Sequence, residues 1–262
     1  MYPTLFEIGS VSADSYYIIW TIAICAMVFW TRKRASVKYG VPYDDAADAL
    51  FWVMCGVFAG ATLGGYFDNW QRFADDPIRI LYFWESGVSS GPGFIGGGLA
   101  GLWKLKKLGV SVNSFAESAS IPCAFMLFVG RWGCFLNGCC RGLPTDSFYG
   151  ISFPDNPSVR VFPSQLSESF AAFIIFVSLL IIEKKLRRSP EDAAKAAFLW
   201  PLFLISYGLY RFVFDFFRAG DRILGLRVGQ HTGLLAVLVG AVWLVYSFKK
   251  MRAVCEDARP VS

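Results

Sequence analysis

The fold class of this chain is decided by one stretch of its sequence, PSQLSESFAAFIIFVSLLII at residues 163–182. Only 14 uncharged residues separate Glu168 from Glu183, whereas a helix needs about 20 residues to cross the hydrocarbon core of a bilayer. A helix that crosses here must therefore take Glu168 close to membrane depth. Ionisable side chains there usually face a bundle interior, unless they snorkel from the helix end to the interface. Ser164 and Gln165 precede Glu168 by four and three residues and share its predicted inward face.

Six further apolar stretches of similar length flank this one. The chain has 262 residues, of which 55% are hydrophobic and 17% charged, and its mean hydropathy is +0.46. An ordinary soluble domain carries about a quarter charged residues, so these values exclude a soluble domain and a disordered chain. The net charge of +5 is too small to indicate a nucleic-acid partner. We expect an all-α integral membrane protein, a single polytopic domain over residues 1–262 with seven transmembrane helices, at 15–31, 47–66, 88–104, 112–130, 163–182, 196–216 and 228–248.

The placement of lysine and arginine predicts how these helices are oriented. Sixteen of the 25 basic residues fall in one set of alternate loops, and none precedes the first span. Such basic loops remain in the cytoplasm, so we expect the N-terminus outside and the C-terminus in the cytoplasm. The 16 residues are Arg32, Lys33, Arg34, Lys38, Lys104, Lys106, Lys107, Lys184, Lys185, Arg187, Arg188, Lys195, Lys249, Lys250, Arg252 and Arg259.

The nine basic residues predicted on the outer side are all arginines. A guanidinium binds phosphate or carboxylate with two parallel hydrogen bonds, which an ammonium group does not. The pattern therefore indicates an anion site at the outer face, or else simple contact with lipid headgroups. These residues are Arg72, Arg79, Arg131, Arg141, Arg160, Arg211, Arg218, Arg222 and Arg227.

The sixth stretch carries a polar stripe. Only 15 uncharged residues separate Lys195 from Arg211, so a helix that spans here draws Arg211 toward membrane depth. Tyr207, Arg211, Asp215 and Arg218 recur at helical spacing on one face. Asp215 is placed to pair with both arginines and to leave donors free for an anion. A self-neutralised stripe of salt bridges is the alternative.

The densest polar signal is GRWGCFLNGCCRG at residues 130–142, after the predicted fourth span. Its glycines permit close backbone approach and positive φ angles. We expect Arg131 to sit at the end of the helix, where a loop begins and presents backbone N–H groups and a guanidinium to a phosphate. Glu117, inside the fourth span, is predicted to face the bundle interior or to snorkel.

Three cysteines in this segment, Cys134, Cys139 and Cys140, admit a disulfide or a metal site. A tetrahedral zinc site needs four ligands, and only three candidates cluster because the single histidine, His231, lies elsewhere. We therefore expect no bound metal and no cofactor.

Several spaced elements match one known family of bacterial membrane enzymes. The elements have the forms GRxxNFxNxExxG, PSQxxE and YGxxR…EFFR, together with a Gly-Gln pair that opens the last helix. The matching residues are Gly130, Arg131, Phe135, Asn137, Gly142, Pro163, Ser164, Gln165, Glu168, Tyr207, Gly208, Arg211, Phe216, Phe217, Arg218, Gly229 and Gln230, with Asp215 in place of Glu. On these residues the chain resembles the prolipoprotein diacylglyceryl transferases. Tyr17 and Glu117 stand where that family has a tyrosine and an acidic residue.

The resemblance implies a seven-helix protein of the bacterial inner membrane that acts without a cofactor. Its implied reaction moves a diacylglyceryl group from phosphatidylglycerol to the lipobox cysteine thiol of a prolipoprotein signal peptide and releases glycerol phosphate. Arg131 and Arg211 are then the catalytic residues, which stabilise the leaving phosphate. The implied substrate-binding residues are Tyr17, Asn137, Gly142, Gln165, Glu168, Tyr207, Asp215 and Arg218.

The chain departs from the family pattern at four positions. Gly91, in a Gly-Pro-Gly sequence, replaces a histidine, and Cys134 and Cys139 replace an asparagine and a glutamate of the signature. An arginine of the second helix is absent near Ala61. Two other functions therefore stay open, a membrane thiol–disulfide protein that uses the three cysteines and a lipid-binding protein without catalytic activity.

Overall fold

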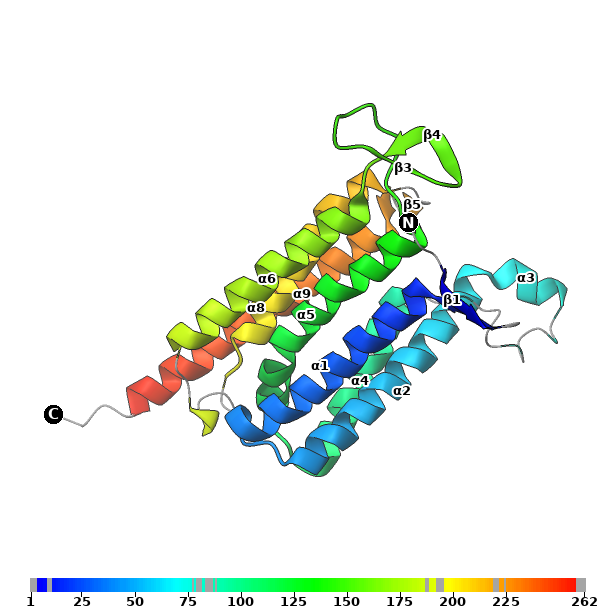
Figure 1. The fold of residues 1–262 in the computed structure, drawn as a ribbon. Helices are drawn as coiled ribbons and strands as arrows, with labels where there is room; N and C mark the ends of the chain where they lie inside the picture. Colours follow the sequence, from blue (N-terminus) through cyan, green and yellow to red (C-terminus); the bar gives the residue numbers. More distant parts are fainter. Residues whose placement is uncertain are drawn as a thin grey trace.

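The computed structural model describes residues 4–8, 11–76, 78, 82, 87, 89–186, 189–191, 196–218, 222–223 and 225–257. Within these residues, seven long helices form an inclined bundle, and each overlaps one of the seven predicted stretches (Figure 1). They are α1 (Ser15–Tyr39), α2 (Tyr43–Asp68), α4 (Ser90–Leu108), α5 (Val112–Asn137), α6 (Ser164–Leu186), α8 (Leu199–Phe214) and α9 (Val228–Asp257). The predicted single domain extends over residues outside this description, as do five of the basic residues named above, Arg79, Arg187, Arg188, Lys195 and Arg259.

Short elements gather at one end of the bundle, which we call the hairpin end (Figure 1). Three two-stranded antiparallel sheets lie there, together with the short helix α3 (Trp70–Asp75) and a 3₁₀ turn, η3 (Asp215–Phe217), that continues α8. The opposite end holds the connections from α1 to α2 and from α4 to α5, and the C-terminal end of α9. The sheets are β1 (Thr4–Ile8) with β2 (Val11–Asp14), β3 (Ile151–Phe153) with β4 (Asn156–Val161), and β5 (Arg222–Ile223) with β6 (Leu226–Arg227).

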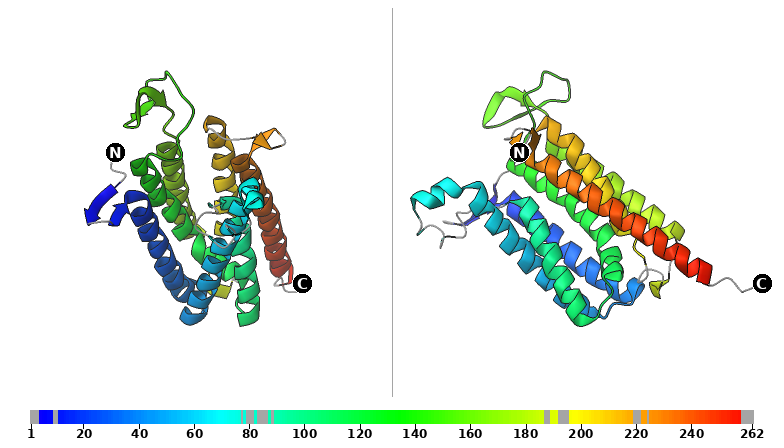
Figure 2. Two further views of the ribbon diagram at one scale, coloured as in Figure 1. Left: turned by 90° about the vertical axis from the view of Figure 1, so that its right-hand side faces the viewer. Right: turned by 180° about the vertical axis from the view of Figure 1, so that it is seen from behind.

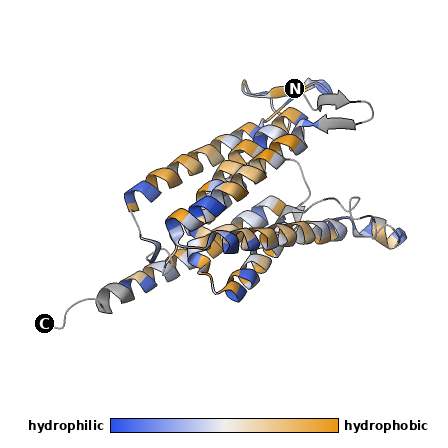
Figure 3. Ribbon diagram, turned by 60° about the horizontal axis from the view of Figure 1, so that its bottom comes forward, coloured by the Kyte–Doolittle hydropathy of each residue, from blue (hydrophilic) through white to orange (hydrophobic). Residues whose placement is uncertain are grey.

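Among the described helices, five are long and apolar enough to cross a membrane by length and composition, namely α1, α2, α5, α6 and α9. The helix α4 ends in a basic turn with Lys106 and Lys107. The helix α8 has 16 residues and therefore spans about 24 Å at 1.5 Å per residue. Apolar residues cover the sides of the helices and polar residues gather toward their ends (Figure 3). The chain is a largely helical, multi-pass membrane protein.

The helices form two groups that meet where α1 lies along α5 (Figure 2). One group contains α1, α2 and α4, and the other contains α5, α6, α8 and α9. Glycine permits the closest approach within the first group: a Cβ at Gly60 would overlap the Pro92 carbonyl oxygen, and one at Gly96 would overlap that of Gly56. Backbones in contact at small residues are typical of helix pairs in membranes. The Gly-Pro-Gly sequence of α4 is thus part of this packing surface.

The structure corrects the prediction for the fourth span. The helix α5 continues to Asn137 and does not end near residue 130. It stops only at Gly138, whose φ of +70° suits glycine, and the Gly138 N–H closes the last turn. Gly130 and Gly133 do not break the helix. They lie where α1 packs closely against α5, with the Trp20 ring against Gly130. Arg131 therefore lies within a helix, more than a turn before its end.

Glu117 of α5 has a structural partner at the end opposite the hairpins. Its buried Oε1 accepts hydrogen bonds from the backbone N–H groups of Phe198 and Leu199, at 2.6 Å each, and of Trp200, at 3.2 Å. These are orphan donors of the first turn of α8, where the helix dipole also favours a negative charge. Glu117 faces inward, as one of the two sequence alternatives predicted, and it caps a neighbouring helix.

Candidate active site

The centre of the site is the carboxylate of Glu168, which is fully buried. Three guanidiniums contact it: that of Arg131 from α5, that of Arg211 from α8 at 3.2 Å, and that of Arg218 from the residue after η3 at 3.1 Å. The side chains of the three arginines are themselves only 13–16% exposed. The prediction that Glu168 and Arg211 face the interior is confirmed, and Arg131, which we expected at a helix end, joins them from within α5.

Asp215 extends this cluster toward α9. Its Oδ1 lies 3.4 Å from Nη2 of Arg211, as the helical spacing predicted. Both groups press against Gly229, where a Cβ would lie 2.6 Å from the Asp215 carboxyl carbon and 2.8 Å from Arg211 Nη2. Arg227 donates to the backbone carbonyl of Asp215, and its own N–H donates to Oε1 of Gln230. The Gly-Gln pair therefore lets α9 begin directly beside the salt bridges.

The start of α6 holds the cysteine-rich loop in place. Ser164 Oγ donates to the carbonyl of Cys140, and Gln165 Nε2 donates to the carbonyl of Cys139, both at 2.6 Å. Cys140 has a φ of +60°, the single positive φ of a non-glycine residue in the described chain. A left-handed conformation costs an L-residue about 1–2 kcal/mol, and these two hydrogen bonds to the adjoining carbonyls help to hold it.

Gly142 occupies a narrow gap between two chain segments. Its N–H donates to the carbonyl of Phe162 at 3.0 Å, and a Cβ would lie 2.6 Å from that oxygen and 2.8 Å from the carbonyl of Phe217. Gly142 also forms a β-bridge with Arg218. Only glycine fits here, and its effect is to fix the backbone that carries Arg218 to Glu168.

Several buried polar atoms around the cluster have no hydrogen-bond partner in the described part of the chain. They are Arg131 Nε, Gln165 Oε1, Tyr210 Oη, Arg227 Nε and Gln230 Nε2, which all belong to the hairpin end of the bundle. Buried polar atoms in native proteins are nearly always satisfied by protein, water or a ligand. Such a concentration around three guanidiniums indicates a site for a polar, anionic group.

Of two further predicted residues, Tyr207 lies beside the cluster and Asn137 lies at the end of α5. Tyr207 packs its ring 5.3 Å from that of Tyr210, within electrostatic reach of Arg211 and Arg131. Asn137 is the half-buried last residue of α5.

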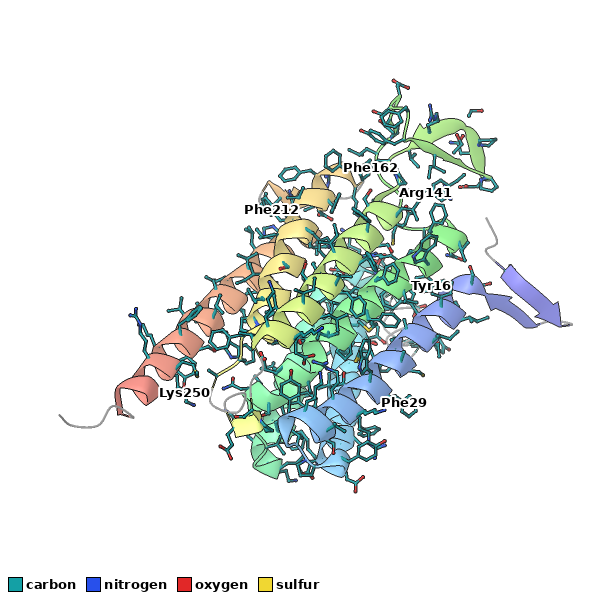
Figure 4. All side chains as sticks on the ribbon, turned by 60° about the vertical axis from the view of Figure 1, so that its left-hand side comes forward. Tyr16, Phe29, Arg141, Phe162, Phe212 and Lys250 are labelled. Carbon is teal, nitrogen blue, oxygen red and sulfur yellow. The ribbon has the colours of Figure 1, made fainter. Side chains whose placement is uncertain are left out.

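Tyr17 does not point toward the cluster, because its side chain is 68% exposed. Its neighbour Tyr16 takes the inward position, within electrostatic reach of Arg131 and the cysteines, and lies at the same end of the bundle as Arg141 and Phe162 (Figure 4). The sequence offers two adjacent tyrosines, and only the rotation of α1 against Gly130 and Gly133 distinguishes them.

The three cysteines form a compact group next to the arginines. All three are free thiols, and their Sγ atoms lie within 4.8 Å of one another. Hydrogen bonds from Cys134 and Cys139, followed by the charges of Arg218 and Arg131, lower the pKa of the Cys140 thiol well below its usual range. Of the three thiols, Cys140 is the one whose thiolate these neighbours favour.

Comparison with known proteins identifies the chain. The sequence pattern of the family described as "Prolipoprotein diacylglyceryl transferase" matches residues 3–246, nearly its whole length. The chain belongs to this family. Its similar relatives include the proteins named "Phosphatidylglycerol--prolipoprotein diacylglyceryl transferase" from Francisella tularensis subsp. tularensis (strain FSC 198) and from subsp. novicida (strain U112). Each is 30% identical over 259 residues, which cover 95% of this chain and 94% of the relative.

The structure shows where the residues that depart from the pattern of this transferase family lie. Cys134 and Cys139, which replace the asparagine and glutamate of the signature, both belong to the group of thiols beside Arg131. Gly91, at the position of the family histidine, abuts α9, where a Cβ would lie 3.0 Å from Cγ2 of Thr232. Two of the four departures therefore lie together, in the group of thiols.

Proposed function

We propose that the cluster around Glu168 is the site at which this transferase moves a diacylglyceryl group from phosphatidylglycerol to the lipobox cysteine thiol of a prolipoprotein. The observation that carries this proposal is the convergence of three guanidiniums on one buried carboxylate, beside buried donors that lack partners. Family membership supplies the substrates. The three guanidiniums, which are only 13–16% exposed, support a positively charged, largely buried site for the phosphate that leaves.

Arg131 and Arg211 are the proposed catalytic residues. Transfer breaks the bond between the glycerol carbon and a phosphate oxygen, so negative charge grows on the departing glycerol phosphate. Donors fixed before the reaction stabilise such charge without reorganisation, and more strongly where water is excluded. Glu168 and Asp215 orient the guanidiniums, because each holds one face of Arg211.

The remaining proposed substrate-binding residues surround this clamp. Arg218 adds a third guanidinium, and Gln165 and Gly142 fix the loops that frame it. Tyr207 lines the cluster from α8, and Asn137 closes α5 beside the cysteines. We assign the inward tyrosine position of α1 to Tyr16, with Tyr17 directed toward lipid.

For the membrane arrangement we propose seven spans in the bacterial inner membrane, with the N-terminus outside and the C-terminus in the cytoplasm. The described basic residues of the cytoplasmic set, such as Lys250, lie at the end opposite the hairpins (Figure 4). Reporter fusions after residues 40 and 190 should then report the cytoplasm, and a fusion near residue 150 should report the outer side. An outer signal at residue 190 would contradict the seven-span arrangement.

The experiment that tests the function is replacement of the native enzyme. The gene should restore growth to a bacterium depleted of its own transferase. The purified protein should label a lipobox peptide with lipid from phosphatidylglycerol, and a peptide with serine in place of the cysteine should stay unlabelled. Phospholipid binding without transfer would favour the lipid-binding alternative, and thiol oxidation without transfer would favour the thiol–disulfide alternative.

A further inference from the structure

Three thiols meet at the hairpin end of α5, and this group is the starting observation. Cys134 is buried in the last turns of the helix, while Cys139 and Cys140 follow its left-handed cap at Gly138. The cap reverses the chain, so residues from the helix and from the loop face each other. Their three Sγ atoms lie within 4.8 Å of one another.

The spacing of these sulfurs suits one tetrahedral metal ion. Zinc–sulfur bonds of about 2.3 Å in tetrahedral geometry place two sulfurs roughly 3.8 Å apart. Thiols that already lie within 4.8 Å need shifts of about 1 Å or less, which side-chain rotation supplies. Soft thiolate ligands in a tetrahedral arrangement select zinc over magnesium or calcium.

The surroundings hold the loop thiols in place. Gln165 and Ser164 donate hydrogen bonds of 2.6 Å to the carbonyls of Cys139 and Cys140. These two hydrogen bonds help to hold the positive φ of Cys140. The guanidiniums of Arg131 and Arg218 lie within electrostatic reach of Cys140, and they offset the negative charge that three thiolates would gather.

We propose that Cys134, Cys139 and Cys140 bind a zinc ion and leave its fourth position open for the cysteine thiol of the substrate. Structural zinc sites are closed by four protein ligands, whereas catalytic sites have three protein ligands and one open position. The expectation of no metal counted protein ligands alone. The proposal departs from that expectation, because the acceptor of this reaction is itself a thiol and can supply the fourth ligand.

The chemistry follows from what zinc does to a thiol, and it rests on the proposed function. A thiol has a pKa of about 8.5, and a thiol that coordinates zinc is deprotonated outright, so its proton passes to solvent. The substrate sulfur then attacks the glycerol carbon of the lipid. A carbon–sulfur bond forms, the carbon–oxygen bond breaks, and glycerol phosphate leaves with the electron pair beside Arg131 and Arg211. No oxidant or reductant is required.

The first test measures metal content without reference to activity. Protein purified under reducing conditions with zinc in the medium should contain one zinc per chain by elemental analysis. Cys134→Ser, Cys139→Ser and Cys140→Ser should each lose most of it while remaining folded in detergent. Cys55→Ser is the matched control, because Cys55 is exposed on α2, and it should retain the metal. Absence of stoichiometric zinc would overturn the proposal. A disulfide between two of these cysteines that persists under the reducing conditions of the purification would overturn it as well.

The second test asks whether the fourth position accepts a thiol. Cobalt substituted for zinc should show thiolate-to-cobalt charge-transfer absorption. A lipobox peptide with cysteine should intensify and shift these bands, and the serine peptide should not. A spectrum unchanged by the cysteine peptide would contradict the open position.

The two proposals fail separately. Transfer without zinc overturns the metal site and leaves the arginine clamp, whereas zinc with thiol binding but no transfer overturns the function and leaves the site.

Discussion

The helix α6 carries one buried or nearly buried carboxylate at each end, and the two are held differently. At the end opposite the hairpins, the carboxylate of Glu183 accepts hydrogen bonds from Nη2 and Nη1 of Arg34, at 2.6 and 3.1 Å, from the Lys38 ammonium at 2.9 Å, and from the Tyr39 hydroxyl at 2.7 Å. Arg34 also donates through Nε to a backbone carbonyl. All three nitrogens of the Arg34 guanidinium therefore donate hydrogen bonds, and we interpret the Arg34–Glu183 pair as a structural contact.

At the hairpin end, Glu168 is shared by three guanidiniums, and of these Arg211 also contacts a second carboxylate, that of Asp215. Arg131 Nε is buried without a partner in the described part of the chain. The comparison teaches that burial and ion pairing do not distinguish a structural ion pair from a functional site. The distinction lies in hydrogen-bond donors that have no partner, and the following predictions test it.

The largest expected effect follows removal of either carboxylate. Breaking a buried ion pair by removing one partner costs roughly 3–5 kcal/mol, because the other charge is left buried. Glu168→Gln should lower stability by about this amount and abolish transfer. Glu183→Gln should lower stability comparably or less and leave transfer per folded molecule unchanged. Thermal unfolding in detergent and transfer to a lipobox peptide measure the two quantities, and full transfer by Glu168→Gln would refute the distinction.

The next effect concerns the arginines. Arg131→Ala or Arg211→Ala should raise the barrier to transfer by about 3 kcal/mol or more, on the order of a hundredfold in rate, by analogy with the loss of one oxyanion donor. Arg→Lys should recover little, since the planar fork is lost. Arg34→Lys is the matched control and should spare transfer. Near-normal transfer by either alanine variant would exclude the catalytic role. Loss of transfer accompanied by loss of folded protein would favour a purely structural role.

A smaller effect is expected at the cap of α8. Glu117→Gln removes the charge that faces three backbone N–H groups, and loss of a helix cap costs about 1 kcal/mol, within a range of about 0.5–2. Unfolding should occur at lower temperature while transfer per folded molecule stays constant. A specific loss of transfer would place Glu117 among the functional residues.

The smallest effect is expected at an exposed pair. Arg141, in the loop after α5, contacts Asp155 of the β3–β4 turn at 2.8 Å. Its hydrogen bond lowers the pKa of the fully exposed Asp155 carboxyl. Such pairs often contribute nothing measurable to stability. Asp155→Asn should leave the unfolding temperature unchanged at pH 7. Because the folded-state pKa is lowered, any difference should shrink as the pH falls from about 4 through that lower pKa, where the wild-type carboxyl becomes neutral like the amide.

The sequence was sufficient for the helices and for most of the clamp. Apolar length alone predicted the seven helices, and the short uncharged runs after Glu168 and before Arg211 predicted that both residues face inward. It placed the end of α5 wrongly, because Gly130 and Gly133 look like breakers until α1 is seen to pack against them. It paired Arg218 with Asp215 by helical spacing, whereas the 3₁₀ turn after Phe214 redirects Arg218 to Glu168.

Tertiary proximity accounts for what remained hidden. Glu117 reads as an isolated charge, since its partners are backbone groups about 80 residues away in α8. The compact thiol group depends on the left-handed turn at Gly138 and on two side chains of α6, none of which spacing along the chain reveals.

The shortness of α8 has a consequence for the lipid. The helix is about 24 Å long, and it is held near one end by Glu117 and near the other by Glu168. In a seven-span arrangement, a strut of this length is shorter than the hydrocarbon layer of about 30 Å, and the bilayer thins beside a span that is too short. The headgroup plane then dips toward the arginines. If the proposed clamp is the reaction centre, the membrane surface is lowered toward it, and a phospholipid reaches it by lateral diffusion with little need to rise out of its leaflet.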